Sequence, residues 1–393
     1  MKSNIVLVEP CLNGHRAGYL SAFINGFIKL GCRVHVLCPN IGDYGEYFDR
    51  FKSSVSFVEF DLSLNPSKTK WILRKEARDY LKILTSRFRE IENQYGIHID
   101  LAFFCMIDFL MGKSLFSRDI EQCFPYSFSG IYFHPVHFRM PIKFANLRFG
   151  PFKIDAPLYA RNCKGFMLLD ESVAKLYRNK GANAFLIPDF SINDDLTDPR
   201  TISEKIKTLA NGRKIICLVG CLQKRKGILS LLRAANELPV NKFYFIIVGE
   251  IVEETYNSEE MKELKQLLQL DHVHTQLGYL SKEEEINEYI ENSDVLFAAY
   301  ENFCHSSNML IKASIFQVPL IVSDGYLMSE QVRRYSLGAI VQESDVEAIV
   351  SVLSEKTIWK LKHSDSFKGG CIDYSRFHSR DKIKGTFQQM LQL

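Results

Sequence analysis

The second half of the chain alternates short apolar runs with amphipathic segments, and this alternation constrains the fold more than any other feature. Each apolar run has the length of a buried strand, and the segments between them carry apolar residues at helical spacing. Strands that alternate with helices form a parallel sheet covered on both faces, so we expect an α/β domain here. The five predicted strands are residues 215–219, 243–248, 273–277, 293–297 and 318–322.

A short basic loop follows the first of these strands. The strand ends at Gly220, and Lys226-Gly227 opens an amphipathic helix a few residues later. The unpaired N–H groups at a helix N-terminus, together with a lysine, suit a bound phosphate. Many α/β proteins carry a Gly-Lys turn for structure only, so this loop alone leaves both interpretations open.

Further polar and glycine residues follow the later strands. Gly249 ends the second strand, and Asp324 follows the fifth. Ser306, Ser307 and Asn308 stand where a helix should begin, which suits helix capping or anion binding. Ligands of parallel sheets bind outside the carboxyl ends of the strands, and we expect all of these residues near such ends.

The order and spacing of these motifs resemble the nucleotide-binding half of GT-B glycosyltransferases, and most closely glycosyltransferase family 4 (glycosyl transferases group 1). That family shows Val-Gly-Arg-Leu, three variable residues, and then Lys-Gly. This chain has Val219-Gly220-Cys221-Leu222 and then Lys226-Gly227. The family's Pro-Val-Val-Ala-Ser-Asp is similar to residues 319–324, and Glu330 falls near a later family glutamate. The resemblance covers roughly residues 210–355 well and the N-terminal half loosely.

The resemblance implies an α/β fold of two Rossmann-like, doubly wound domains that face each other across a cleft. The C-terminal domain would bind a nucleotide-diphosphate sugar and the N-terminal domain a glycan or lipid-linked acceptor, with retention of configuration and without a metal or other cofactor. The resemblance implies catalytic roles for His134 and Glu301. The residues it implies for donor binding are Gly14, Gly220, Arg225, Lys226, Gly249, Ser306, Ser307, Asn308 and Glu330.

Two positions depart from the family pattern. Cys221 replaces one of the two cations that hold the donor diphosphate, and Arg225 or Lys224 could supply the missing charge. Lys312 stands where the second glutamate of the family's Glu-x7-Glu motif grips the ribose. The first glutamate is either Glu301, with a longer loop, or absent.

The N-terminal half predicts the same architecture. Residues 5–9 form a first strand, and a loop containing Gly14 follows it; there is no full G-x-G-x-x-G, so a redox dinucleotide site is not supported. Residues 100–107 and 131–133 are further strands, the latter ending at His134. A histidine there could hydrogen-bond to substrate near neutral pH or serve only structure. His137 is a near alternative to His134, and His15 is a further candidate that could simply contact the interdomain face.

Domain boundaries follow from the same pattern. We expect an acceptor-binding domain over residues 1–188, on which a C-terminal helix, residues 380–393, packs back. A nucleotide-sugar-binding domain would span residues 189–379. Residues 166–172 are predicted as the last strand of the first domain with a helix cap, and residues 191–199 as the hinge.

Composition limits the remaining options. The formal charge is +3, so nucleic-acid binding is not implied. The ten cysteines form no C-x2-C pair, which indicates reduced thiols in a cytoplasmic protein without a metal cluster. Residues 2–4 lead straight into a strand and no apolar stretch approaches a membrane span, so neither a signal peptide nor a span is expected.

Two basic segments bear on the acceptor. Basic and aromatic residues interleave over residues 138–153, which suits peripheral contact with an anionic membrane face or a lipid-linked phosphate, and also suits an ordinary loop. Residues 68–89 form a second basic stretch, for which a solvated helix face is favoured. We therefore expect a glycosyltransferase of surface polysaccharide assembly. A noncatalytic glycan-binding or scaffold subunit and a nucleotide-sugar epimerase are the alternatives.

Overall fold

The computed structural model describes residues 2–60, 70–135, 155–280 and 282–392. The chain divides into two compact units. The first domain comprises Met1–Pro188 and Arg380–Leu393, and the second comprises Asp189–Ser379. The segment predicted to contact a membrane, residues 138–153, lies outside the described residues.

The first domain is built on a seven-stranded parallel sheet with the strand order β3-β2-β1-β4-β5-β6-β7. The order reverses between β1 and β4, so β1 has β2 on one side and β4 on the other. Apart from Asn4 at the start of β1, the central strands β1 and β4 are apolar and buried, as strands with helices on both faces must be. The strands are β1 Asn4–Val8, β2 Arg33–Cys38, β3 Val55–Glu59, β4 Leu101–Phe104, β5 Phe128–Ile131, β6 Cys163–Leu168 and β7 Ala184–Leu186.

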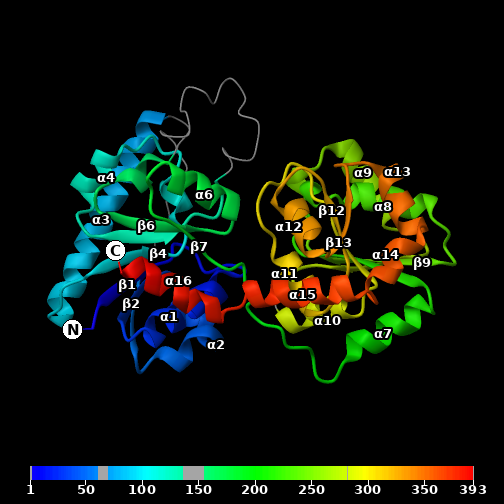
Figure 1. Ribbon diagram of the computed structural model, residues 1–393, viewed down its shortest axis with the longest axis horizontal. Coiled ribbons are helices and arrows are strands. Elements are labelled where there is room, and N and C mark those ends of the chain that lie inside the picture. Colours follow the sequence, from blue (N-terminus) through cyan, green and yellow to red (C-terminus); the bar gives the residue numbers. More distant parts are fainter. Residues whose placement is uncertain (1, 61–69, 136–154, 281, 393) are drawn as a thin grey trace. The chain divides into compact units, whose positions relative to one another are not determined.

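Helices from both ends of the chain cover one face of this sheet (Figure 1). Phe387 of α16 stacks on Phe27 of α1 with ring centroids 4.2 Å apart, and Gly26 leaves room for that ring. The helices are α1 Arg16–Lys29, α2 Gly45–Phe48, α3 Lys70–Tyr95, α4 Ser117–Cys123, α6 Glu171–Asn179 and α16 Asp381–Leu391. Short 3-10 turns are η1 Ile41–Tyr44, η2 Asp49–Phe51, η3 Ile107–Leu110 and η6 Ala156–Tyr159.

The basic stretch predicted as a solvated helix face belongs to α3, which is amphipathic. Leu81, Leu84 and Phe88 are fully buried against the sheet. On the same helix, Arg74 and Arg78 both pair with the buried carboxylate of Asp119 in α4, so part of the positive charge is used within the domain.

The second domain is built on a six-stranded parallel sheet with the order β10-β9-β8-β11-β12-β13. Here the order reverses at β8, which lies between β9 and β11. Both sheets and their helices confirm the predicted pair of Rossmann-like α/β domains. The strands are β8 Lys214–Val219, β9 Phe243–Gly249, β10 Val273–Leu277, β11 Val295–Ala298, β12 Leu320–Ser323 and β13 Gly338–Val341.

Two hydrophobic clusters cover the opposite faces of this second sheet. One cluster contains buried residues of α11, α12 and α15, and the other contains those of α8 and α13. The helices are α7 Thr201–Ala210, α8 Ile228–Glu237, α9 Ser258–Leu267, α10 Glu283–Glu291, α11 Asn308–Ile315, α12 Leu327–Tyr335, α13 Val346–Ser354, α14 Lys356–Leu361 and α15 Asp365–Phe377. The 3-10 turns are η7 Lys224–Lys226 and η8 Glu253–Thr255.

Three predictions for the first domain are wrong in detail. β5 spans Phe128–Ile131 instead of residues 131–133, so His134 follows the strand end by three residues. β4 ends at Phe104, and residues 107–110 turn into a 3-10 helix. The last strand is β7, Ala184–Leu186, which pairs with β6; the predicted last strand is β6 itself.

The segment predicted as a hinge, residues 191–199, is held by side chains of α10 within the second domain. The amide of Asn287 donates to the carbonyls of Asn193 and Asp195, at 3.0 and 2.8 Å. Glu288 accepts from the hydroxyl of Thr197. Because these bonds fix the segment to the second domain, the chain leaves the first domain at Pro188 and not within residues 191–199.

None of the helices described here is both long and apolar enough to cross a lipid bilayer.

Candidate active site

The loops after β8 and β11 meet at the point where the strand order of the second sheet reverses. Such a point leaves a crevice at the carboxyl ends of the strands, where ligands of open α/β sheets bind. The two loops are joined directly, because the backbone N–H of Glu301 donates to the carbonyl oxygen of Arg225 at 2.7 Å. Residues 220–227 and 299–307 therefore form one candidate site.

Glycines allow the backbones around this site to approach each other closely. A Cβ atom on Gly249, at the end of β9, would lie 1.9 Å from the carbonyl oxygen of Gly220. A Cβ atom on Gly227 would lie 2.5 Å from the carbonyl oxygen of Ala299. Gly227 also has a φ of +71° and is the N-cap of α8. These glycines hold the loops together, a structural role that each can fill whether or not it also contacts a ligand.

Two cationic side chains of the loop are not neutralised by a carboxylate among the described residues. The ammonium group of Lys226 donates to the hydroxyl of Tyr300 at 2.7 Å and lies over its ring. The guanidinium of Arg225 lies 4.7 Å from the ring centroid of Phe303 and donates to Gln223 through Nε. One terminal nitrogen of Arg225, Nη1, is buried and has no hydrogen-bond partner in the described structure.

Lys224, the other candidate for the missing charge, is already paired. Its ammonium group forms an ion pair with Glu260 of α9, and the resulting hydrogen bond lowers the pKa of the Glu260 carboxyl. Arg225 is thus better placed than Lys224 to supply a second positive charge beside Lys226.

Three residues predicted to bind the donor lie at the N-terminus of α11, and their side chains differ in hydrogen bonding. Ser306 donates its hydroxyl proton to the buried carboxylate of Asp189. Ser307 is the N-cap, and its hydroxyl oxygen accepts from the N–H of Met309 at 3.4 Å. Both amide atoms of Asn308 are buried and have no hydrogen-bond partner among the described residues. Because unpaired buried polar atoms are costly, Asn308 is the side chain here that most clearly requires a further partner.

The two predicted glutamates lie at different depths. Glu301 is half-buried between the two loops, and its carboxylate accepts from the hydroxyl of Ser230 at 3.4 Å. Glu330 is exposed in the first turn of α12, which follows β12.

Lys312, which stands at the family's ribose-binding glutamate, is fully buried. Its ammonium group lies 2.7 Å from Glu283 and also donates to the amide oxygen of Asn287, both on α10. A buried lysine requires such partners, and breaking the pair would leave an uncompensated charge. Lys312 therefore joins α11 to α10 and is committed to structure.

The predicted residues of the first domain lie near the reversal point of its own sheet. Gly14 lies in the turn between β1 and α1 with a φ of +64°. The carboxylate of Asp108, which follows β4, accepts from the backbone N–H groups of Phe133 and His134 at 2.8 and 2.7 Å. Asp108 also lies 3.0 Å from Nδ1 of His134, whose side chain is 50% exposed. One carboxylate thus fixes both the backbone and the ring of His134.

Glu9, at the end of β1, is a buried carboxylate that the sequence analysis did not select. It lies 3.0 Å from the guanidinium of Arg16 and accepts from the N–H of Cys11 at 3.1 Å. Burial raises the pKa of Glu9 to about 7, against the opposing effects of Arg16 and Cys11. Tyr300 and Phe303, which orient the two cations, were also missed; aromatic residues beside a strand end were the available signal.

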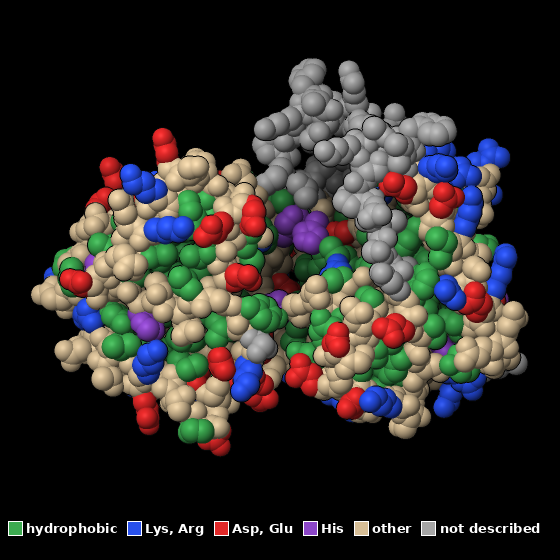
Figure 2. Space-filling view, turned by 180° about the vertical axis from the view of Figure 1, so that it is seen from behind, with side chains coloured by type: hydrophobic (Ala, Val, Ile, Leu, Met, Phe, Trp, Pro, Cys, Tyr) green, Lys and Arg blue, Asp and Glu red, His purple; other side chains and the backbone are tan. Residues whose placement is uncertain are grey.

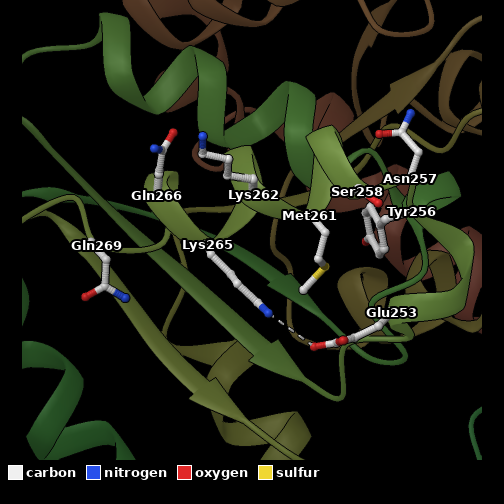
Figure 3. A pocket seen from close by; sticks show the side chains of 9 residues that line it. All are labelled: Glu253, Tyr256, Asn257, Ser258, Met261, Lys262, Lys265, Gln266 and Gln269. Atoms are coloured by element: carbon white, nitrogen blue, oxygen red, sulfur yellow. Dashed lines mark ion pairs between the residues drawn. The ribbon is translucent and has the colours of Figure 1, made fainter.

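A groove of about 650 Å³ lies elsewhere on the second domain, along α9 and η8 (Figure 3). Most of the residues that line it are polar or charged, and Lys265 and Glu253 among them form an ion pair of 3.7 Å. None of the predicted site residues lines this groove, so we assign it no role in the candidate site.

Surface charge and metal ligands add no further site. On the face drawn in Figure 2, Lys and Arg side chains are interspersed with Asp and Glu. Within the described ranges, no group of three or more His, Cys, Asp or Glu is arranged to hold a metal ion.

Comparison with known proteins relates this geometry to a family. Residues 199–356 match the sequence model described as "Glycosyl transferases group 1". This match covers the β8–α8 and β11–α11 loops. The search of curated protein sequences gave no match.

Solved structures extend the likeness to the whole chain. Sucrose-phosphate synthase from Thermosynechococcus elongatus is 15% identical with a TM-score of 0.71, over 100% of this chain and 98% of that one. Alr3699/HepE from Anabaena, in complex with UDP and glucose, is 13% identical with a TM-score of 0.69, over 99% of both chains. WaaG, a glycosyltransferase involved in lipopolysaccharide biosynthesis, is 11% identical with a TM-score of 0.56, over 98% of both. At these identities the likeness shows the fold. Together with the match over residues 199–356, it supports a glycosyltransferase with the GT-B fold.

Proposed function

We propose that this glycosyltransferase moves a sugar from a nucleotide-diphosphate donor to a glycan or lipid-linked acceptor. The observation that carries the proposal is the set of unsatisfied polar groups at the reversal point of the second sheet. Lys226 has only a neutral hydroxyl and a ring as partners, and Arg225 and Asn308 have buried atoms without partners in the described structure. A diphosphate would satisfy all three groups at once.

The chemistry of the donor fits these groups. Cleavage of the bond between sugar and diphosphate develops negative charge on the leaving diphosphate oxygen. Charge-assisted hydrogen bonds from Lys226 and Arg225 would stabilise that charge most strongly in the transition state. The backbone N–H groups at the start of α11 are further hydrogen-bond donors, and the positive end of the helix dipole at this terminus also favours an anion. Complexes of Anabaena HepE with UDP and with UDP-glucose support a uridine diphosphate sugar as the first donor to test.

The remaining roles are proposals on the same basis. Glu301 would face the donor sugar, and His134, oriented by Asp108, would hydrogen-bond to sugar or acceptor. Gly14, Gly220 and Gly249 would let the backbone approach the donor, and Glu330 would contact the nucleoside. The finer proposal is a retaining, metal-independent, cytoplasmic enzyme of polysaccharide assembly with peripheral membrane contact through residues 138–153, in keeping with the likeness to WaaG.

A thermal-shift screen of UDP, GDP, ADP, dTDP and CMP tests the donor site. A ligand that binds only the native state raises the melting temperature by mass action. We expect one nucleoside diphosphate to raise the melting temperature of wild type and to leave the Lys226→Ala variant unchanged. Lys242→Ala, an exposed lysine beyond the end of α8, is the matched control and should respond as wild type does. No response to any nucleotide would contradict the proposal.

A noncatalytic glycan-binding subunit is the second candidate, because Lys312 replaces a ribose-binding carboxylate and is buried in an ion pair. Such a subunit could bind nucleotide without turning over a nucleotide sugar. Release of nucleoside diphosphate from a nucleotide sugar, slow alone and accelerated by an acceptor, would exclude it. Isomerisation of the sugar without an acceptor would instead indicate an epimerase.

A further inference from the structure

A buried polar cluster surrounds Asp189, the first residue of the second domain. The Asp189 side chain is inaccessible, and its carboxylate accepts the hydroxyl proton of Ser306. Its backbone N–H donates to Nδ1 of His378 at 2.9 Å. Asp189 follows Pro188, where the chain leaves the first domain, and His378 stands two residues before Arg380, where the chain returns to it. One residue thus contacts both a loop of the candidate site and the second chain crossing.

The chemical state of His378 agrees with this arrangement. Its imidazole is buried, and its ring centroid lies 4.3 Å from that of Tyr374. Burial lowers the pKa of His378 to about 4, so the ring is neutral near pH 7. A neutral ring can present an unprotonated Nδ1 to the N–H of Asp189, as the observed bond requires. Tyr374, which is also buried, shares a side-chain hydrogen bond with Ser306 and closes the cluster.

The Asp189 contact changes the role of Ser306. A hydroxyl has one proton, and here that proton lies on the bond to the Asp189 carboxylate. Phosphate oxygens accept hydrogen bonds, so the Ser306 side chain has no proton left for them. The structure therefore assigns Ser306 to holding the loop, and leaves Lys226, Arg225 and Asn308 to contact the donor.

We propose that Asp189 is a positioning residue that joins the donor loop, residues 299–307, to the two segments through which the chain crosses between domains. The proposal rests on the proposed function, since it takes a nucleotide as the ligand of that loop. If one of these two segments unfolds locally so that the Asp189 contacts break, Ser306 is also released and the donor loop is disturbed. Nucleotide bound to the loop must then oppose that local unfolding, because coupling between two sites is reciprocal.

Amide hydrogen exchange of the full-length protein, with and without UDP at about 100 times its Kd, tests the coupling. Ligand that binds only the closed form can slow exchange through opening by up to roughly 100-fold. We expect residues 186–191 and 376–382 of wild type to exchange at least tenfold more slowly when UDP is bound. Calorimetric titration of the same samples gives the UDP affinity independently.

Variants of His378 separate coupling from simple destabilisation. His378→Phe keeps an aromatic ring on Tyr374 but removes the acceptor for Asp189 N–H. We expect its UDP-induced protection over residues 376–382 to fall below threefold, while UDP affinity stays within threefold of wild type. His378→Asn restores an acceptor and should restore the protection. Ser314→Ala removes a buried hydroxyl of α11 that donates to the carbonyl oxygen of Leu310 in the same helix. It is the matched control and should protect as wild type does.

The outcomes distinguish the inference from the proposed function. Failure of wild type to bind any nucleoside diphosphate overturns both. Nucleotide binding without protection of the crossings, or protection that His378→Phe retains in full, overturns the coupling and leaves the donor site intact. If His378→Phe does not fold, Ser306→Ala cuts the other contact of Asp189, and undiminished protection at residues 186–191 in that variant overturns the coupling equally.

Discussion

Aromatic rings orient the two cations that we assign to the donor. Lys226 contacts Tyr300, and Arg225 lies over Phe303, so both cations are directed by neighbours that leave their charge uncompensated. A cation over an aromatic face keeps most of its capacity to bind an anion. The charge of Lys224, in contrast, is already compensated by its ion pair with Glu260. This difference among three consecutive basic residues separates ligand-binding candidates from structural ones.

Glu9 predicts a pH dependence of folding. Its folded pKa is raised from 4.5 to about 7, so the folded chain retains a proton that the unfolded chain loses. The corresponding stability is fully present below pH 4.5 and is lost as the pH rises to 7. Replacement by Glu9→Gln should leave stability at pH 5 nearly unchanged and raise it at pH 8 by up to roughly 3 kcal/mol. Urea unfolding at both pH values measures the difference.

The interpretation of the Glu9→Gln result depends on the titratable groups around Glu9 and on a control variant. Arg16 lowers the pKa of Glu9, and Cys38, Cys105 and Tyr80 are the other titratable groups coupled to it. Glu237→Gln, on the exposed face of α8, should change stability equally at pH 5 and pH 8. A Glu9→Gln variant that behaves in the same way would show that Glu9 does not titrate between these values.

At the scale of the element, the glycine at the end of β9 determines how closely the loop after β8, residues 220–227, packs against it. Gly249 ends β9 and Gly278 follows β10, and their φ values are +131° and +118°. Alanine at either position strains the backbone, but only at Gly249 would the added Cβ meet another backbone atom, 1.9 Å away. We expect Gly249→Ala to weaken UDP binding at least tenfold in a calorimetric titration.

Gly278→Ala is the control for Gly249→Ala. Its added Cβ would meet nothing within 4 Å, so it carries the conformational strain without the clash. Equal UDP affinities in the two alanine variants would indicate that the contact between Gly249 and Gly220 does not shape the site.

The sequence predicted five of the six strands of the second sheet, because most of them are apolar runs bounded by polar residues or glycine. β13, Gly338–Val341, was missed, and β10 carries polar residues in its interior. The sequence located β5 poorly, since Ser129 and Gly130 interrupt the apolar pattern although both are buried. Gly130 is required there because a Cβ would lie 2.5 Å from the carbonyl oxygen of Phe104, a contact between separate strands. Local pattern cannot reveal such a contact.

The sequence could predict those site residues that lie close together in the chain, beside the ends of strands. Arg225, Lys226 and Asn308 follow strand ends in a recognisable order, and the sequence alone selected them. The partners that separate their roles come from distant segments: Glu260 for Lys224, Asp189 for Ser306 and α10 for Lys312. Since these contacts span 25 to 117 residues, only the folded chain shows which polar groups are already paired.

At the scale of the whole molecule, the proposed roles are divided between the two domains. The proposed nucleotide site lies in the second domain, and His134 lies in the first. His134→Ala should therefore leave the affinity for UDP, which lacks the transferred sugar, within twofold of wild type. We expect the same variant to lower kcat for release of UDP from the sugar donor at least tenfold in a steady-state assay.

His98→Ala is the control for His134→Ala, since His98 lies in the same domain and its side chain is 82% exposed. It should change neither quantity. A loss of UDP affinity in His134→Ala as large as its loss of kcat would contradict the division.

The most direct test of the central claim compares the affinities of UDP and uridine for wild type and Lys226→Met by calorimetric titration. Hydrogen bonds to charged groups contribute about 1.5–3 kcal/mol each, so the diphosphate should strengthen wild-type binding by well over tenfold. The account predicts that Lys226→Met loses at least tenfold of this preference for UDP while its affinity for uridine is unchanged. Equal preference for UDP over uridine in both proteins would contradict a diphosphate site at Lys226.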